Sequence, residues 1–129
     1  MNYALLVGLE RLRAEGLQAP WERRRANAQL LWHGLQALGL ELVVAPENRL
    51  LPLTTVQFPA GVNDLKVRQS LLNERQIEIA GGLGPVWGKI WRIGLMGHSS
   101  QSANVKQLLQ ALHPIVGYSV MAGVWRRTR

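Results

Sequence analysis

Arg92 stands between apolar neighbours near the end of a glycine-rich segment, IEIAGGLGPVWGKIWRIGLMG (residues 77–97). An arginine side chain is planar and always charged, and it can hold a carboxylate through two parallel hydrogen bonds. In a strand IWRIG, Trp91 and Ile93 point to one face of the sheet and Arg92 points to the other. These residues allow Arg92 to bind a small carboxylate; a surface arginine on the solvent side of a hairpin is the alternative.

The segment around Arg92 contains six of the chain's thirteen glycines. Glycine loses more conformational entropy on folding than any other residue, so such a cluster serves tight turns or a close approach of the backbone to a ligand. From the residues alone, a hairpin loop without special function and a ligand-binding turn are equally open.

Other catalytic and metal-binding patterns are absent from the sequence. The chain has no cysteine and no HExxH motif, and its three histidines lie far apart, so we expect no metal site. The segment GLGPVWGKI lacks the first glycine and the Ser or Thr of a phosphate-binding loop, and a strand rather than a helix is expected after it. There is no GxSxG motif either. The residues therefore predict no complete catalytic centre.

Composition indicates a single globular domain. Of 129 residues, 47% are hydrophobic and 18% are charged, and the formal net charge is +7. The basic excess lies mainly in the first quarter and at the C-terminal end, where we expect solvated helix faces rather than a nucleic-acid surface. The N-terminus lacks the features of a signal peptide, and no apolar run approaches the length of a membrane span. We therefore expect a cytoplasmic protein without a nucleic-acid or membrane partner.

The elements that must position Arg92 follow from the pattern of apolar residues. The predicted helices cover residues 3–17, 20–38, 63–75 and 102–113, and the predicted strands cover 41–44, 54–58, 77–80 and 89–94. The order is ααββαββα, and the strands of each pair lie too close in sequence for a parallel crossover. We predict an α+β fold, with a small antiparallel or mixed sheet of about four strands and helices on one face.

Apolar spacing and capping residues support these helices. Gly39 follows the second helix as a left-handed cap, Asn63 is placed to cap the third, and Asp64 lies near the positive end of that third helix. Apolar side chains recur at helical spacing in the second and fourth helices: Ala28, Leu31, Leu35 and Leu38, then Val105, Leu108, Leu109 and Leu112.

Three longer stretches of the sequence match a known pattern: YALLVGLERLRAEGL, WERRRANAQLLWHGLQALGLELV and IEIAGGLGPVWGKIWRIGLMGHSSQSANVKQLLQAL. They resemble the C-terminal small domain of class V pyridoxal-phosphate-dependent aminotransferases, which are transferases of PLP fold type I. The resemblance is greatest to the alanine–glyoxylate and serine–pyruvate branch and extends from about residue 2 to 113. The IEIxGGLG…GKxWRIGxMG block is much more specific than a short phosphate motif.

The resemblance implies a substrate-binding role for Arg92, because in that family the arginine of the RIG motif binds the α-carboxylate of the substrate. It places Gly81, Gly82 and Gly84 in the region that shapes the small domain near the substrate entrance, and we expect Gly81 and Gly82 to contribute to substrate binding with Arg92. It also implies pyridoxal phosphate as cofactor of the full-length enzyme, a small amino acid and a 2-oxo acid as substrates, and a homodimer.

The sequence departs from the family in one respect that bears on activity. The Schiff-base lysine, the aspartate that pairs with the pyridine nitrogen and the phosphate-binding residues belong to a large domain N-terminal to this one, and none of these motifs is present. Only Lys66, Lys89 and Lys106 occur, outside the family's lysine context. We expect a fragment or truncated gene product that binds no cofactor by itself and is inactive alone.

Two further expectations follow from the missing large domain. The chain divides into a class V small domain at residues 1–113 and an atypical basic tail at residues 114–129. The first helix should expose an apolar surface, with Tyr3, Leu6 and Val7 as candidates. The alternative function is a non-catalytic, stand-alone domain that binds a protein partner or an anionic surface.

Overall fold

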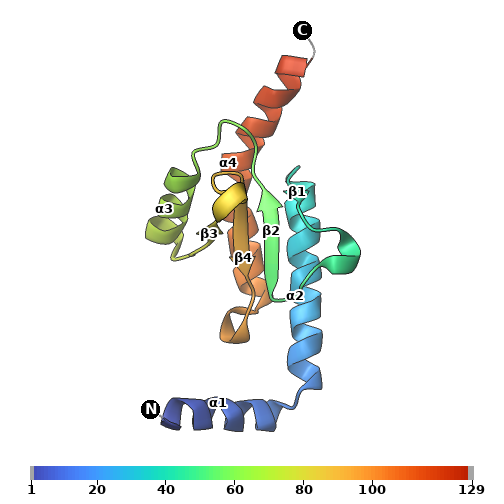
Figure 1. Ribbon diagram of the computed structural model, residues 1–129, viewed down its shortest axis with the longest axis vertical. Helices are drawn as coiled ribbons and strands as arrows, with labels where there is room; N and C mark the ends of the chain where they lie inside the picture. Colours follow the sequence, from blue (N-terminus) through green and yellow to red (C-terminus); the bar gives the residue numbers. More distant parts are fainter. Residues whose placement is uncertain (1, 128–129) are drawn as a thin grey trace.

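The computed structural model describes the chain from Asn2 to Arg127, and its side chains as far as residue 117 (Figure 1). The order of helices and strands is the predicted ααββαββα, which confirms the α+β fold class. The elements, with η for a short 3-10 helix, are α1 (Asn2–Glu15), α2 (Gln18–Ala37), β1 (Glu41–Leu42), η1 (Pro46–Asn48), β2 (Leu53–Gln57), α3 (Asp64–Arg75), β3 (Ala80–Gly81), η2 (Gly84–Val86), β4 (Ile90–Gly94), η3 (Gly97–Ser99) and α4 (Ser102–Arg127).

The strands form one four-stranded sheet in the order β1-β2-β4-β3, and every pair of neighbours is antiparallel. The central strands β2 and β4 pair over five residues each, whereas the edge strands β1 and β3 have two residues each. Arg92 lies in the middle of β4, opposite Thr55 of β2 on one side and Ala80 of β3 on the other. The predicted arginine therefore stands on a central strand rather than at the margin of the sheet.

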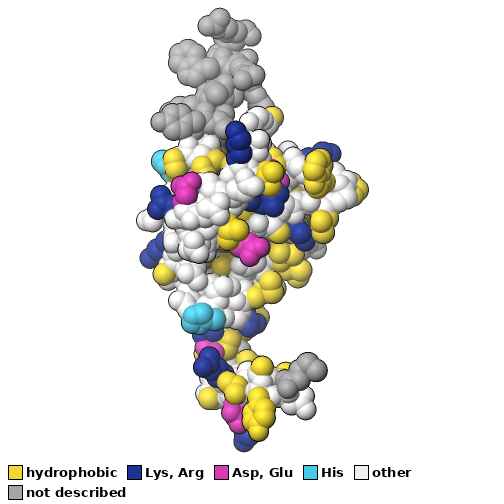
Figure 2. Space-filling view, turned by 90° about the vertical axis from the view of Figure 1, so that its left-hand side faces the viewer, with side chains coloured by type: hydrophobic (Ala, Val, Ile, Leu, Met, Phe, Trp, Pro, Cys, Tyr) yellow, Lys and Arg dark blue, Asp and Glu magenta, His cyan; other side chains and the backbone are white. Residues whose placement is uncertain are grey.

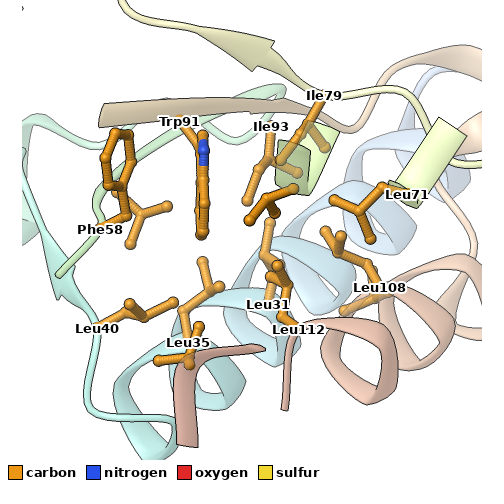
Figure 3. Close-up of a cluster of buried hydrophobic side chains, with 14 of the residues drawn as sticks. Leu31, Leu35, Leu40, Phe58, Leu71, Ile79, Trp91, Ile93, Leu108 and Leu112 are labelled. Carbon is orange, nitrogen blue, oxygen red and sulfur yellow. The ribbon is translucent and has the colours of Figure 1, made fainter. Parts of the chain in front are cut away.

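Helices α2 and α4 pack against each other, and α2 also contacts β1 and β2 (Figure 1). Figure 3 shows leucines of the two helices converging on Trp91 and Ile93 of β4. The ring of Phe58 lies beside that of Trp91, with ring centroids 4.9 Å apart. Burial of apolar area drives this packing. Most of the predicted stripe residues are buried, and Leu38 and Leu109 are partly buried; the buried ones are Ala28, Leu31, Leu35, Val105, Leu108 and Leu112.

The helix caps agree with the sequence. The side chain of Asn63 accepts a 3.0 Å hydrogen bond from the backbone N–H of Lys66, as expected of an N-cap. Gly39 follows α2 with a φ of +78°. These caps fix where α2 and α3 end and begin, and hence how the chain enters the sheet.

The edge strand β3 is shorter than the predicted strand at residues 77–80. Ile79 is buried, Ile77 is partly buried and Glu78 is exposed, so the alternation of a strand is present. Pairing with β4 is nevertheless confined to Ala80 and Gly81. The preceding residues turn instead toward α3, where the N–H of Ile77 donates to the carbonyl of Leu71 at 3.0 Å. The alternation of apolar and polar residues at positions 77–80 therefore predicted which side chains are buried, but it did not predict which residues pair with β4.

Helix α4 is longer than predicted, because it continues through Pro114 to Arg127. A proline inside a helix removes one backbone hydrogen bond and costs about 3 kcal/mol. Val116 is fully buried in the core and Ile115 packs against it, so apolar burial just beyond the proline offsets that cost. The division into a domain at 1–113 and a tail at 114–129 stays a prediction, and the side chains of residues 118–129 lie outside those described.

Helix α1 contributes no buried residue to the domain. Tyr3, Leu6 and Val7 are exposed, as predicted, and Tyr3 is 83% exposed. Figure 2 shows apolar side chains open to solvent at the end of the molecule where α1 lies. None of the helices in the described part of the chain has the length and apolar character that crossing a membrane requires.

Candidate carboxylate-binding site

Strand β4 presents its central residues alternately to the core and to the opposite face of the sheet. Trp91 is 0% exposed and Ile93 is 3% exposed, and both belong to the core cluster on the side of the helices. Arg92 lies between them on the other face and is partly buried. The faces predicted from IWRIG are therefore those observed, and the arginine stands on a face that α2 and α4 do not cover.

The guanidinium of Arg92 is held at one end by the edge strand. Its Nε–H donates a 2.8 Å hydrogen bond to the carbonyl oxygen of Gly81. In the described part of the chain neither Nη atom of Arg92 has a protein acceptor, and neither of the two ion pairs involves this residue. A guanidinium fixed through Nε keeps its two Nη atoms for a planar, forked contact, which is the geometry that a carboxylate fits.

Gly81 lies directly against a charged pair on α3. A Cβ placed on Gly81 would stand 3.3 Å from Oδ2 of Asp64 and 3.4 Å from Nη2 of Arg68. The first separation is slightly tighter than ordinary van der Waals contact and the second lies at its lower limit, so the charged pair occupies the space beside Gly81 that a side chain would take. The structure thus brings together Gly81 and Arg92, two of the residues expected from the sequence to bind substrate, through the carbonyl group of the glycine.

Gly82 has a different environment from Gly81. It is buried, and a Cβ at this position would stand 2.0 Å from the backbone oxygen of Val86 and 3.0 Å from Cγ1 of Ile90. The η2 turn folds back across this glycine, so residue 82 must be glycine for the turn to close. Gly82 shapes the connection between β3 and β4, and its Cα faces the turn.

A polar network behind β3 was not predicted from the sequence. Asp64, the first residue of α3, accepts hydrogen bonds from Nε of Arg68 at 2.8 Å and from Nη2 of Arg68 at 2.9 Å. The indole N–H of Trp91 donates to the same carboxylate at 2.9 Å. The Arg68 hydrogen bonds, helped by the one from Trp91, lower the pKa of Asp64, and the carboxylate raises the pKa of Arg68. The four-residue spacing of Asp64 and Arg68 on a predicted helix could have indicated their ion pair.

The side chains that could hold a cofactor or a metal ion are dispersed. Lys66, Lys89 and Lys106 are all exposed. In the described part of the chain, no group of three or more His, Asp or Glu side chains is arranged to hold a metal ion. His33 is exposed on α2. None of these residues approaches Arg92 within a recorded hydrogen bond or ion pair.

Two of the cavities in the described part of the chain share no lining residue with each other, and neither includes Arg92. One, of about 220 Å³, opens where residues 77–79 diverge from β4, beside η3 and α4. The other, of about 110 Å³, lies under η1, where the guanidinium of Arg49 stacks over the ring of Trp32 at 5.5 Å. Neither is lined by Arg92 or by a lysine.

Solved structures with the same fold include aminotransferases. The alanine–glyoxylate aminotransferase from Nostoc sp. superposes with a TM-score of 0.84 and 46% sequence identity, over 88% of this chain and 30% of that structure. The ureidoglycine–glyoxylate aminotransferase from Bacillus subtilis gives a TM-score of 0.84 and 38% identity, over 91% of this chain and 30% of that one. The fold of this chain is therefore also the fold of one part of each of these two aminotransferases.

Curated relatives agree with this likeness, although no family model matches the chain. The (S)-ureidoglycine–glyoxylate transaminase of Bacillus subtilis is 39% identical over 116 residues, which are 90% of this chain and 28% of the relative. The alanine–glyoxylate aminotransferase of Callithrix jacchus is 43% identical over 111 residues, which are 85% of this chain and 27% of the relative. The chain thus spans less than a third of the length of these relatives. Over the matched region it belongs to the class V aminotransferases, as a counterpart of the C-terminal domain of the alanine–glyoxylate and ureidoglycine–glyoxylate enzymes.

Proposed function

We propose that this chain supplies the substrate-carboxylate site of an aminotransferase that moves an amino group between a small amino acid and a 2-oxo acid such as glyoxylate. The observation that carries the proposal is the state of Arg92. Its Nε is fixed on Gly81, and its two Nη atoms have no protein acceptor in the described part of the chain. Relatives named for alanine, ureidoglycine and glyoxylate support the substrate class.

Arg92 would bind and orient rather than react. The forked contact between the two Nη atoms and a carboxylate is charge-assisted and fixes the plane of the bound group. An amino acid and its 2-oxo acid carry the same carboxylate next to the reacting carbon, so one arginine serves both substrates. Holding that group in place sets the position of the neighbouring carbon, which is how orientation contributes to rate.

The cofactor that the family implies does not fit the side chains of this domain alone. Pyridoxal phosphate supplies the chemistry of amino-group transfer in enzymes of this kind. A lysine that binds it must lie in a sheltered site, but Lys66, Lys89 and Lys106 are exposed and none lines either cavity. We therefore assign cofactor binding to the part of the relatives that this chain does not match, and Gly81 and Gly82 to shaping the substrate side.

The open face around Arg92 and the exposed helix α1 support the same assignment. Both would be covered in a longer enzyme, whose large domain would close the arginine into a pocket. A homodimer of that longer enzyme is part of the proposal. The exposed α1 is also the one observation that favours the alternative, a non-catalytic domain that docks on a protein partner.

A fusion tests this proposal. The chain is joined to the large domain of the Bacillus subtilis ureidoglycine–glyoxylate transaminase, in place of the domain that it matches. We expect a fused protein that binds pyridoxal phosphate and transfers an amino group to glyoxylate. A fusion that folds and binds the cofactor but shows no transfer with alanine or ureidoglycine as donor contradicts the proposal. Salt-sensitive binding of the chain itself to nucleic acid or to anionic vesicles would favour the alternative function.

A further inference from the structure

The side chain of Arg92 is oriented by its hydrogen bond to the carbonyl oxygen of Gly81, and Gly81 belongs to a strand that has few ladder hydrogen bonds. Strand β3 has only two residues, Ala80 and Gly81, and it pairs with β4 over that length alone. The chain before it diverges from β4, and the chain after it enters the η2 turn. A two-residue edge ladder leaves the Gly81 carbonyl free to shift unless something else fixes it.

The ion pair on α3 provides that support. Asp64 and Arg68 form a bidentate pair, and their side chains are 18% and 31% exposed. The pair lies beside Gly81, where an added Cβ would be 3.3 Å from Oδ2 of Asp64 and 3.4 Å from Nη2 of Arg68. In Figure 1, α3 lies on the β3 side of the sheet, consistent with this contact.

The same carboxylate also reaches β4 directly. Oδ1 of Asp64 accepts the indole N–H of Trp91 at 2.9 Å, and Trp91 is both the ladder partner of Gly81 and the residue before Arg92. Asp64 is therefore hydrogen-bonded to β4 and lies beside Gly81 of β3. One carboxylate is thus placed next to both the donor strand, β4, and the acceptor strand, β3.

We propose that Asp64 and Arg68 are positioning residues for Arg92, acting through Gly81 and Trp91. The pair holds the Gly81 carbonyl where it accepts the Nε–H of Arg92, and so presents the two Nη atoms to a carboxylate. The inference rests on the proposed function for its purpose, but the contacts that it assigns exist in the chain without substrate. It predicts an effect on the arginine that a loss of general stability would not give.

The direct test is the solvent-exchange rate of the Arg92 Nε–H, measured by ¹H–¹⁵N NMR on the full chain without ligand. Asp64→Asn keeps the size of the side chain but removes its charge. We expect it to speed exchange of the Arg92 Nε–H by about five- to tenfold, the effect of weakening one hydrogen bond. Arg68→Lys keeps the charge but loses the fork, and we expect a smaller increase.

Two controls separate positioning from stability. Glu74→Gln removes an exposed acid on the same helix, whose carboxylate accepts a hydrogen bond from the hydroxyl of Ser70, and it should leave the Arg92 Nε–H unchanged. The backbone amide of Leu35, within the buried part of α2, reports opening of the whole core. A positioning role requires the exchange of the Arg92 Nε–H to rise more than that of the Leu35 amide; equal increases, or no increase, overturn the inference.

The fused enzyme links this network to substrate binding. We expect Asp64→Asn to raise the KM for alanine and for glyoxylate by about three- to tenfold, with cofactor affinity unchanged. If Arg92→Ala leaves substrate affinity unchanged, the proposed function fails, and the exchange measurement still decides the inference. If Arg92→Ala weakens binding but Asp64→Asn matches Glu74→Gln in exchange rate and KM, the inference alone fails. Should Asp64→Asn not fold, Arg68→Lys decides both measurements.

Discussion

The Nε–H of Arg92 donates to the carbonyl oxygen of Gly81 at 2.8 Å, and this bond joins a central strand to a two-residue edge strand. It uses one donor of the guanidinium and leaves the Nη atoms facing the open side of the sheet. The glycine-rich sequence therefore serves two ends: Gly81 approaches a charged pair on α3, and Gly82 lies beneath a tight turn.

Gly82→Ala should destabilise the chain strongly. The added Cβ would stand 2.0 Å from the backbone oxygen of Val86, and a backbone atom cannot move aside as a flexible side chain can. We expect a loss of about 2–4 kcal/mol in the free energy of unfolding. Urea unfolding followed by tryptophan fluorescence measures it.

Gly8→Ala is the matched control for that substitution. Gly8 lies within α1, and nothing stands within 4 Å of the position of its added Cβ. Alanine favours an exposed helix by up to about 1 kcal/mol, so this variant should be neutral or slightly stabilising. A Gly82→Ala protein as stable as Gly8→Ala would show that the η2 turn does not close over residue 82 as described.

Because of the Asp64–Arg68 pair, we expect part of the free energy of unfolding to be lost at acid pH. Hydrogen bonds from Arg68 lower the pKa of Asp64 in the folded chain below its ordinary value of 3.8. The stabilisation is complete above that value, and it is lost as the pH falls through the lowered pKa of the folded state. Asp64→Asn should lose about 1–2 kcal/mol near neutral pH and show a flatter decline in acid.

The measurement for that pair is the free energy of unfolding between neutral pH and strong acid. Glu74→Gln, on the exposed side of the same helix, should keep the acid dependence of the unchanged chain. If Asp64→Asn and the unchanged chain lose stability in parallel as the pH falls, the carboxylate does not contribute as its contacts indicate.

Much of the fold could be predicted from the sequence because its signals were local. Leucines four residues apart lie on the same face of a helix, and the faces that carry them in α2 and α4 are buried: Leu31 and Leu35, then Leu108 and Leu112. Asn63 caps α3 by accepting a hydrogen bond from the backbone N–H of Lys66, only three residues further along the chain. Such features need no knowledge of distant contacts.

The remaining features depend on contacts between distant segments. The length of β3 depends on how residues 77–79 pack against α3 and α4, and the passage of α4 through Pro114 depends on the burial of Val116. The Asp64–Trp91 hydrogen bond joins residues 27 positions apart, and the periodicity of a single helix or strand cannot predict such a contact. Alternation with Trp91 and Ile93 predicted the face of the sheet on which Arg92 lies, whereas the expected roles of Arg92 and Gly81 came from the family resemblance.

The chain alone should not form a specific adduct with pyridoxal phosphate. Lys66, Lys89 and Lys106 are exposed and lie on different elements or turns, so none is favoured by a sheltered site. Mixing the chain with pyridoxal phosphate, reducing with borohydride and mapping the product by mass spectrometry should give weak labelling without preference. Stoichiometric labelling of one lysine would contradict the assignment of cofactor binding to another part of the enzyme.

Helix α1 should cause the isolated chain to self-associate through its exposed apolar side chains. Its apolar side chains are exposed at both ends and in the middle of the helix, with Leu5 66% and Leu9 53% exposed. We expect binding of a hydrophobic dye and concentration-dependent self-association by sedimentation. Replacing Leu5 and Leu9 together by Gln should reduce both signals, because it removes apolar area without touching the core. A monomer that binds no dye before the replacement would contradict this.

The central claim is that Arg92 binds the α-carboxylate of the substrate, and half-reaction kinetics of the fused enzyme with alanine and with glyoxylate test it most directly. Arg92→Ala should weaken both substrates by about ten- to several-hundred-fold, because a charge-assisted forked contact contributes roughly 1.5–3 kcal/mol. Arg92→Lys should recover only part of that loss, since it keeps the charge but not the fork. Arg75→Ala, an exposed arginine on α3, should change neither substrate, and cofactor affinity should be unchanged in all three. If Arg92→Ala binds alanine and glyoxylate as tightly as Arg75→Ala does, Arg92 is a surface arginine and the account of the site is wrong.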